Sequence, residues 1–260
     1  HRRMARPALN WQLRRLPVCA STEVELERWL AQRDQAPGAV AQGLGVQLAV
    51  VARRQRFGQG QRGRVWQSPE GGLWISAAFP WPTAQQPAQP GAQLEAPAAL
   101  APLGLAAAVG VAQQLQGLGI AVALKWPNDL LVGGHKLAGL LPRLRWRGGR
   151  VRWAQVGLGL NGINRPPAGA ISVAQALAGV RFHPQAKPQR LLPLALAGLE
   201  WAQQMASDPA AVHQAAEALL VRPPQGLVHA GERWQVVGLE RDGGLRLERP
   251  GAAITLQRHF

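Results

Sequence analysis

The stretch LKWPNDLLVGGHKLAGLL, residues 124–141, combines residue types that can bind and activate an anion. It contains Asp129 together with Lys125 and Lys136, two of only three lysines in a chain that otherwise uses arginine as its cationic side chain. A lysine ammonium is a compact, movable point charge, whereas arginine favours fixed bidentate pairing. A point charge is useful where negative charge moves between oxygens, as in phosphoryl or nucleotidyl transfer. The stretch therefore predicts an anion-handling site, with an ordinary solvated β-hairpin as the alternative.

A turn and a strand must position these side chains. Asn128 and Asp129 follow a Trp-Pro pair and suit a turn, whether or not they also bind a ligand. Lys136 begins a new strand, in which regular alternation would place Lys136 and Gly139 on opposite faces. The missing side chain at Gly139 would let a ligand lie close to the backbone.

A second candidate site is the glycine- and arginine-rich segment RRQRFGQGQRGRVW, residues 53–66, which follows an apolar run at 46–52. Its glycines, of which Gly58 is the first, free the backbone to approach an anion. Arg62 and Arg64 supply planar donors for phosphate or carboxylate oxygens. The spacing matches neither a Walker loop nor a dinucleotide-binding fingerprint. The segment predicts an anion-binding loop, with a solvated connection as the alternative.

A third candidate is VGLGLNGIN, residues 156–164, an apolar strand that ends in glycines and asparagines. Asn161 can hydrogen-bond a purine edge or complete a turn, and the sequence leaves both interpretations open.

The remaining pattern predicts an α+β fold. A short strand at 10–18 precedes a helix that opens in STEVELERWLAQ, with Thr22 as its N-cap and Glu25 as the capping-box partner. Paired glycines at 133–134 and 148–149 predict two tight hairpin turns. The other expected elements are strands at 46–52 and in GGLWISAAF, a helix at 96–119, four strands between 120 and 161, helices at 188–205 and 208–220, and a β-rich segment at 226–257.

Composition is typical of a globular protein in a reducing compartment. With 260 residues, 47% of them hydrophobic, the chain can bury a substantial core. The lone Cys19 excludes an internal disulfide framework and a multi-cysteine zinc site. No apolar run approaches the roughly 18 residues of a membrane span, and no signal peptide is visible. We expect a cytoplasmic protein without a membrane partner.

The formal net charge of +15 raises the question of nucleic acid binding. The basic residues are scattered along the chain, and arginine, alanine, glycine and proline are enriched together, which indicates compositional drift. We therefore expect no specific DNA binding, with a DNA-binding regulator as the alternative.

Taken together, these stretches resemble the biotin protein ligases. KWPNDLLVGGHKLAGLL is similar to that family's most diagnostic segment, and GQGQRGRVW to its biotin loop. VGLGLNGIN resembles a later Gly-Asn strand, AISV at 170–173 a serine-containing turn, and STE at 21–23 an N-terminal Ser-Thr motif. The resemblance implies an α+β fold with a mixed central β-sheet, flanking helices and a small C-terminal SH3-like β-barrel. It implies a catalytic domain at 1–222 and a C-terminal domain at 223–260.

The resemblance also implies a two-step reaction. Biotin is activated by ATP as biotinyl-5′-AMP and is then transferred to a lysine of the biotin carboxyl carrier protein of acetyl-CoA carboxylase. Lys136, Asp129 and Arg64 would be the catalytic residues, with Asp129 on the side of the Mg²⁺ ion. The biotin site would consist of Ser21, Thr22, Gln55, Gly58, Trp66, Lys136 and Gly139. The ATP site would consist of Arg62, Arg64, Lys125, Asn128 and Asn161.

Three positions depart from the family pattern. Gln59 and Gln61 stand where the loop usually has arginine, and Glu23 stands where asparagine is usual. The two glutamines remove cationic partners of the adenylate, so one alternative is a module that holds biotin without activating it. Another alternative is a lipoate or octanoate ligase or transferase of the same fold.

The resemblance also bears on size and assembly. About twenty residues precede the Ser-Thr motif, too few for a winged-helix domain, so a short form without a DNA-binding domain is expected. Family members can dimerise through the central sheet, which makes a homodimer an expectation to test.

Overall fold

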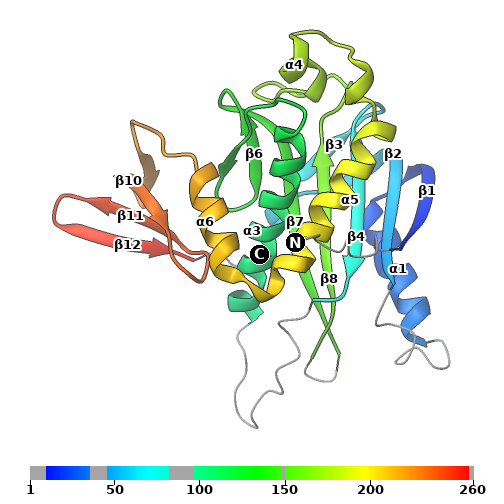
Figure 1. Ribbon diagram of the computed structural model, residues 1–260, viewed down its shortest axis with the longest axis horizontal. Coiled ribbons are helices and arrows are strands. Elements are labelled where there is room, and N and C mark those ends of the chain that lie inside the picture. The colour runs from blue at the N-terminus through cyan, green and yellow to red at the C-terminus, as the bar shows by residue number, and fades with distance from the viewer. Residues whose placement is uncertain (1–9, 36–45, 82–95, 148–149, 258–260) are drawn as a thin grey trace, which may run out of the picture.

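The computed structural model describes residues 10–35, 46–81, 96–147 and 150–257 (Figure 1). The main sheet has eight strands: β1 (Trp11–Cys19), β2 (Gln47–Gln59), β3 (Val65–Ser68), β4 (Leu73–Phe79), β5 (Ala123–Lys125), β6 (Asp129–Val132), β7 (His135–Arg147) and β8 (Arg150–Leu160). Their order is β1-β2-β4-β8-β7-β6-β5, and β3 pairs with β2. β1 and β2 are parallel and the other neighbours are antiparallel, which confirms the predicted mixed sheet.

The helices are α1 (Thr22–Gln35), α3 (Ala96–Gln116), α4 (Val173–Ala178), α5 (Pro188–Gln204) and α6 (Pro209–Leu219), with short 3-10 turns η1 (Gln61–Gly63), η3 (Pro184–Ala186) and η4 (Met205–Ser207). Four of the helices, α1, α3, α5 and α6, lie where the sequence predicts them, whereas α4 was not predicted. Asp208 caps α6, because its carboxylate accepts a hydrogen bond from the N–H of Ala211 at 3.1 Å. Within the described ranges, no helix is long and apolar enough to cross a membrane.

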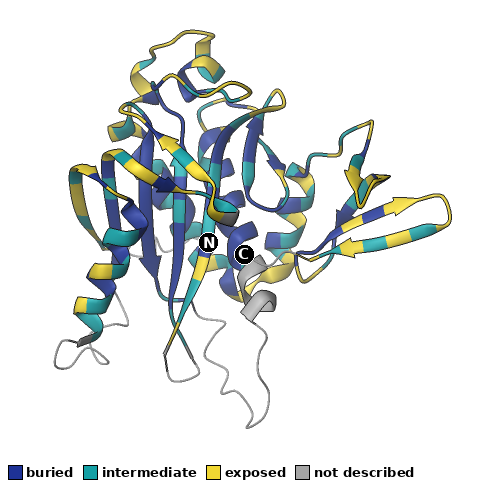
Figure 2. Ribbon diagram, turned by 180° about the vertical axis from the view of Figure 1, so that it is seen from behind, coloured by how far each residue is buried: buried dark blue, intermediate teal, exposed yellow. Residues whose placement is uncertain are grey.

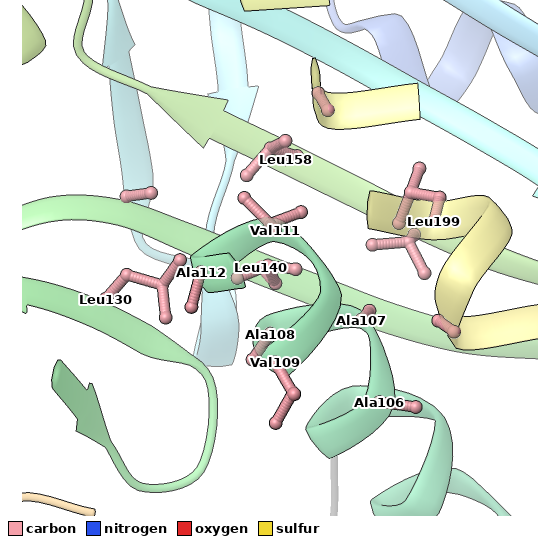
Figure 3. Packing of buried hydrophobic residues seen from close by; sticks show 14 of the residues in the cluster. Ala106, Ala107, Ala108, Val109, Val111, Ala112, Leu130, Leu140, Leu158 and Leu199 are labelled. Carbon is pink, nitrogen blue, oxygen red and sulfur yellow. The ribbon is translucent and has the colours of Figure 1, made fainter. Parts of the chain in front are cut away.

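The two faces of the main sheet are covered by different helices. Successive side chains of a strand point to opposite faces, so Ala49 of β2 joins the larger core while Leu48 and Val50 join a smaller one. The larger core lies beneath α3 and α5, and Figure 3 shows alanines and valines of α3 beside Leu199 of α5 and close to Leu140 and Leu158 of the sheet. The smaller core lies beneath α1, on the face seen in Figure 2.

α3 and α5 touch through their backbones. A Cβ atom added to Gly110 of α3 would lie 2.0 Å from the carbonyl oxygen of Gly198 in α5. A Cβ atom on Gly198 would lie 2.7 Å from the carbonyl carbon of Gly110. Only glycine at both positions allows the helices to cross this closely, so they form one tightly packed layer behind the sheet.

The C-terminal strands form a small β unit, as predicted. β9 (Leu227–His229), β10 (Glu232–Leu239), β11 (Leu245–Arg249) and β12 (Ala252–Leu256) make a four-stranded antiparallel sheet in the order β12-β11-β10-β9. Trp234 and Leu247 of this unit are buried in the larger core. The indole N–H of Trp126 also donates to the carbonyl of Gly243 at 2.8 Å. Because the core is shared, the domain division at residue 222 stays a prediction.

The glycine- and arginine-rich segment is largely a β-hairpin, whereas the sequence predicted a loop. β2 continues beyond the predicted 46–52 as far as Gln59, and β3 pairs with it through Gly58–Trp66 and Gln59–Val65. A Cβ atom on Gly58 would lie 2.4 Å from the carbonyl oxygen of Trp66. Gly58 is therefore needed for strand pairing.

The start of α1 also corrects a prediction. The helix begins at Thr22, and the preceding Ser21 accepts a hydrogen bond from the N–H of Glu23 through Oγ at 3.2 Å. The hydroxyl of Thr22 instead bonds Gln55 on β2 at 3.0 Å. Thr22 is therefore not the N-cap, because its side chain is committed to the sheet.

The turn between β6 and β7 is confirmed. Gly133 and Gly134 have φ angles of 56° and 82°, the left-handed conformation that a two-residue hairpin turn requires. The second predicted glycine turn, at 148–149, lies outside the described residues.

Candidate functional site

The sheet face that carries α1 also holds a cleft of about 420 Å³. Its walls come from the start of α1, the β2–β3 hairpin, and strands β4 to β8. The predicted site residues that line it are Ser21, Thr22, Gln55, Arg64, Trp66, Lys125, Asn128, Asp129, Lys136 and Gly139. The fold thus gathers three separate sequence motifs around one cavity.

One end of the cleft is a chain of uncharged hydrogen-bonding groups. Gln55 Oε1 accepts from the N–H of Thr22 at 2.7 Å and from its hydroxyl at 3.0 Å. Ser76 Oγ lies 2.8 Å from Thr22 Oγ1, and Ser76 is the donor because the Thr22 hydrogen is used on Gln55. The amide nitrogen of Gln55 donates to Ser68 Oγ at 2.8 Å, and Ser68 donates to the carbonyl of Trp66 at 3.1 Å. This one-way chain fixes the orientation of the Gln55 amide.

The indole ring of Trp66 occupies the middle of the cleft. It lies on Gly139 of β7 and Gly159 of β8, where a Cβ atom would lie 2.8 Å and 2.4 Å from ring atoms, respectively. The sequence predicted that the bare backbone at Gly139 receives a ligand; in this structure it receives the indole. The indole N–H is buried and has no hydrogen-bond partner among the described residues.

The other end of the cleft is charged. Lys136 Nζ lies 2.8 Å from Asp129 Oδ1 and 4.7 Å from the centre of the Trp66 ring. Lys125 is the direct partner of Asp129 in the β5–β6 pair, and Asp129 is the partner of Gly139 in the β6–β7 pair. Two ammonium groups and one carboxylate therefore share this end, which suits an anion with mobile charge.

Lys136 and Gly139 lie on the same face of β7, contrary to the predicted alternation. A Cβ atom on Gly139 would lie only 3.2 Å from Lys136 Cε. Consecutive residues of β6 pair with Ala138 and then with Lys136, so Leu137 is an extra residue in β7. A β-bulge of this kind re-aims the side chains that follow it. The bulge is what brings the lysine into the cleft.

The backbone of Lys136 is held on both sides by the serine-containing turn. Its N–H donates to the carbonyl of Gly169 at 3.2 Å, and its carbonyl accepts from the N–H of Ile171 at 3.0 Å. Ser172 then caps α4, where its hydroxyl accepts from the N–H of Gln175 at 3.2 Å. This turn fixes the position of Lys136.

The two asparagines of the predicted ATP site have structural partners. Asn128 is buried, and its side chain donates to the carbonyl of Leu140. Asn161 does not line the cleft; it is buried, and its Oδ1 accepts from Asn164 Nδ2 at 3.0 Å. The N–H of Asn161 also donates to the carbonyl of Leu137 at 3.1 Å. The Asn161–Asn164 bond lies within a turn and the other two bonds join the asparagines to β7, so roles in ATP binding stay predictions.

Two further predicted residues do not contribute described side chains to the cleft. Gly58 belongs to the hairpin itself, where it pairs with Trp66 and allows the close approach of β2 and β3. The backbone of Arg62 lies in η1, but its side chain is outside the described part of the structure, so its contact with ATP stays a prediction.

An ion pair between a buried carboxylate and a half-exposed guanidinium lies at the edge of the cleft. Glu23 lines the cavity and is 8% exposed. Arg143 Nε, from β7, lies 2.5 Å from Glu23 Oε1. Burial raises the pKa of the Glu23 carboxyl above its ordinary value; Arg143 opposes this and Glu27 adds to it. The position that departs from the family pattern thus carries a carboxylate with one close cationic partner.

Several residues of this site were not predicted. Ser76 interrupts the otherwise apolar strand β4, and that single polar residue was a usable signal. Gly159 gains its role only from its partner across the sheet, and Arg143 only from contacts with residues far away in the sequence. Gly159 lies in the candidate segment 156–164, but its contact with Trp66 depends on the fold, and Arg143 has no local pattern that marks it.

The middle of the chain, which supplies most of the cleft, matches a known protein family. Residues 40–161 match the family described as "Biotin/lipoate A/B protein ligase family". This match covers slightly less than half of the chain, which is similar to that family over these residues.

Two relatives are similar to about half of this chain. Over 120 residues, the chain is 38% identical to the bifunctional ligase/repressor BirA of Bacillus subtilis (strain 168), covering 45% of this chain and 33% of that protein. Over 132 residues, it is 39% identical to the biotin–[acetyl-CoA-carboxylase] ligase of Paracoccus denitrificans, covering 51% of each. The chain therefore spans between a third and about half of the length of these relatives.

Solved structures show the same fold. The biotin protein ligase from Aquifex aeolicus, in complex with biotin and ATP, superposes with a TM-score of 0.70 at 22% identity and covers 95% of both chains. The biotin protein ligase from Leishmania major, in complex with biotinyl-5-AMP, has a TM-score of 0.54 at 22% identity and covers 98% of this chain and all of that one. At this level of identity, the likeness concerns the fold.

Proposed function

We propose that the protein is an ATP-dependent biotin protein ligase. It would activate biotin as biotinyl-5′-AMP and transfer the biotinyl group to a lysine of a biotin carboxyl carrier protein. The observation that carries this proposal is a cleft with a neutral hydrogen-bonding end at Thr22, Gln55 and Ser76 and a cationic end at Lys136. Ser76 lies on β4 and Lys136 on β7, two strand spacings or roughly 10 Å apart across the sheet.

The neutral end favours biotin over lipoate. The ureido group of biotin has two N–H donors and one carbonyl acceptor, which match a row of hydroxyl and amide groups. The dithiolane ring of lipoate offers no comparable groups. A site built to hydrogen-bond a polar group discriminates strongly against an analogue that lacks it. The neutral end would therefore hold the ring system of biotin and direct its carboxylate towards Lys136.

The charged end would support the first step. An oxygen of the biotin carboxylate attacks the α-phosphorus of ATP, the bond to the β-phosphate oxygen breaks, and pyrophosphate leaves. Two anionic groups must meet, and the Lys136 ammonium offsets their repulsion. Asp129, 2.8 Å away, holds that ammonium in place before the reaction.

The second step would use the same end of the cleft. The amine of the carrier lysine attacks the carbonyl carbon of biotinyl-AMP, an amide forms and AMP leaves. The amine must lose a proton, and Asp129 is the carboxylate beside the reacting groups that can accept it. Arg64 and the β2–β3 hairpin would cover the mixed anhydride and keep water away.

A Mg²⁺ ion would enter with ATP. In the described part of the chain, no three His, Cys, Asp or Glu side chains lie together as a complete metal site. Mg²⁺ commonly binds through one or two carboxylates together with substrate phosphates and water. Asp129 uses Oδ1 on Lys136 and has a second oxygen, so it fits a metal that is held mainly by the nucleotide.

The partner and location follow from the proposed reaction. The acceptor would be the carrier protein of acetyl-CoA carboxylase, the enzyme in the name of the Paracoccus denitrificans relative. The protein would work in the cytoplasm and would bind no specific DNA sequence. A homodimer is part of the same proposal, and light scattering on the purified protein tests it.

Biotin-dependent exchange of pyrophosphate into ATP tests the proposal directly. We expect exchange with biotin and at least a hundredfold less with lipoate or octanoate, as expected when an unmatched polar site rejects an analogue. Exchange with lipoate or octanoate instead would favour the lipoate branch of the family. Biotin binding without any exchange would favour a non-catalytic binding module.

A further inference from the structure

We infer that Arg143 is a positioning residue that ties the β2–β3 hairpin to the start of α1 and so keeps the cleft closed over its contents. This inference rests on the proposed function, because the expected contents are biotin and its adenylate. It concerns two positions, Gln59 and Glu23, at which the chain departs from the family pattern.

The geometry joins three elements through one guanidinium. Arg143 Nε lies 2.5 Å from Glu23 Oε1, and Arg143 Nη2 donates to Gln59 Oε1 at 3.3 Å. Glu23 belongs to the first turn of α1, Gln59 is the last residue of β2, and Arg143 projects from the central strand β7. Both partners line the cleft. The guanidinium thus connects two of its walls.

The chemistry of the partners explains why an arginine performs this role. A guanidinium has five N–H donors in a rigid plane, so it can serve two acceptors in different directions. The carboxylate of Glu23 is mostly buried, with 11% of its side chain exposed, and a buried charge requires a partner. Glutamine at position 59 supplies a carbonyl acceptor, whereas an arginine there would supply only donors. The acceptors of Glu23 and Gln59 therefore match the donors of Arg143.

The hairpin beyond Gln59 is the part of the cleft wall that this contact controls. Gly60, Gln61 and Arg64 line the cleft, and the N–H of Gly60 is bonded to the carbonyl of Arg64 at 2.8 Å. This bond closes the turn that directly follows Gln59. If Arg143 holds Gln59, it holds the segment that would cover the adenylate. Loss of the contact should make residues 60–64 more mobile without removing a group from the reaction centre.

The test compares Arg143→Gln with a matched control, Arg145→Gln. Arg145 lies two residues further along β7 and also bridges to α1, through Glu27 and through Asp34 at 3.3 Å. The control therefore removes an equivalent strand-to-helix ion pair away from the hairpin. Amide hydrogen exchange of residues 60–64 is measured on the protein without ligand. Biotinyl-AMP release and the kinetics of pyrophosphate exchange are measured on the same proteins.

We expect Arg143→Gln to speed both exchange at residues 60–64 and release of biotinyl-AMP by about tenfold, the loss of one charge-assisted hydrogen bond. KM for biotin should rise while kcat for pyrophosphate exchange changes less than threefold, because the lost contact acts on binding. Arg145→Gln should change neither rate. In a Gln59→Ala background, Arg143→Gln should have no further effect on release, since the two residues act through one contact.

Three outcomes would overturn the inference: rates for Arg143→Gln equal to those of the unmodified protein, the same acceleration in Arg145→Gln, or additive effects of Gln59→Ala and Arg143→Gln. The hydrogen-exchange measurement needs no activity. It therefore decides the role of Arg143 even if the unmodified protein forms no biotinyl-AMP, the result that would instead refute the proposed function.

Discussion

Gly139 and Gly159 are direct partners in the antiparallel β7–β8 pair, and the indole ring of Trp66 rests on both. Two missing side chains side by side create a flat area of backbone in an otherwise filled sheet face. The aromatic ring that covers this area also lies 4.7 Å from the ammonium of Lys136. The central part of the cleft is thus built from one aromatic ring and the absence of two side chains.

The first prediction concerns this packing. Gly159→Ala places a methyl group 2.4 Å from the indole, so the ring or the strand must move. We expect a loss of about 1–3 kcal/mol in the free energy of unfolding, as is typical of overpacking. Gly157→Ala is the control, because its Cβ meets its nearest neighbours at 3.5 Å or more, an ordinary contact distance. Urea unfolding should show a change within about 0.5 kcal/mol for the control; equal losses would contradict the packing described.

A second prediction concerns Lys136. Lys136→Gln removes the positive charge from the cleft, and we expect biotin-dependent pyrophosphate exchange to fall about a hundred- to a thousandfold, as for the loss of one preorganised electrostatic group. Lys187→Gln, which changes an exposed lysine outside the cleft, should exchange at the unmodified rate. Circular dichroism verifies that both variants fold. A folded Lys136→Gln protein with near-normal exchange would remove this lysine from the mechanism.

A third prediction concerns the glutamine in the hairpin. From the sequence, arginine at positions 59 and 61 would be expected to retain biotinyl-AMP better. The structure reverses the expected sign at position 59, because Gln59→Arg removes the acceptor of Arg143 and brings two like charges together. We expect Gln59→Arg to release biotinyl-AMP faster, and a second change, Arg143→Gln, to slow release again by removing the repulsion. If Gln59→Arg alone released biotinyl-AMP more slowly than the unmodified protein, the expectation from the sequence, better retention by arginine, would hold.

A fourth prediction concerns the only cysteine. Burial raises the pKa of the Cys19 thiol to about 11, and the charge of Glu25 adds to the effect. The thiolate is the reactive form, so alkylation by iodoacetamide near neutral pH should be slow in the folded protein and fast after unfolding in urea. The rate for the folded protein should continue to rise with pH up to about 11. A plateau near pH 8 or 9, measured by mass spectrometry, would show an ordinary exposed thiol.

Much of the site could be predicted because its residues lie in compact motifs. The segment from Lys125 to Gly139 is continuous, so any fold that forms its turn and hairpin keeps those side chains together. The paired glycines at 133–134 specify that hairpin by themselves. Likewise, the helices behind the sheet follow from apolar periodicity and caps such as Asp208.

The rest could not be predicted because it depends on contacts between distant parts of the chain. Simple alternation placed Lys136 and Gly139 on opposite faces, and the bulge at Leu137 that reverses this is set by pairing with β6. Asn161 is indistinguishable in the sequence from a ligand-binding asparagine, yet its side chain bonds Asn164. Arg143 has no marked neighbours along the chain, because its partners lie on α1 and β2.

The contact between Gly110 and Gly198 has a mechanical consequence. Where two helix backbones touch, no flexible side chains remain between them to absorb a displacement, and tightly packed interiors have low compressibility. The layer of α3 and α5 is therefore a rigid support for one face of the sheet. Strands β7 and β8 cannot yield towards it when a substrate enters from the other side. We therefore expect any movement that admits or releases ligands to occur in the β2–β3 hairpin on the other side of the sheet, and not in α3 and α5.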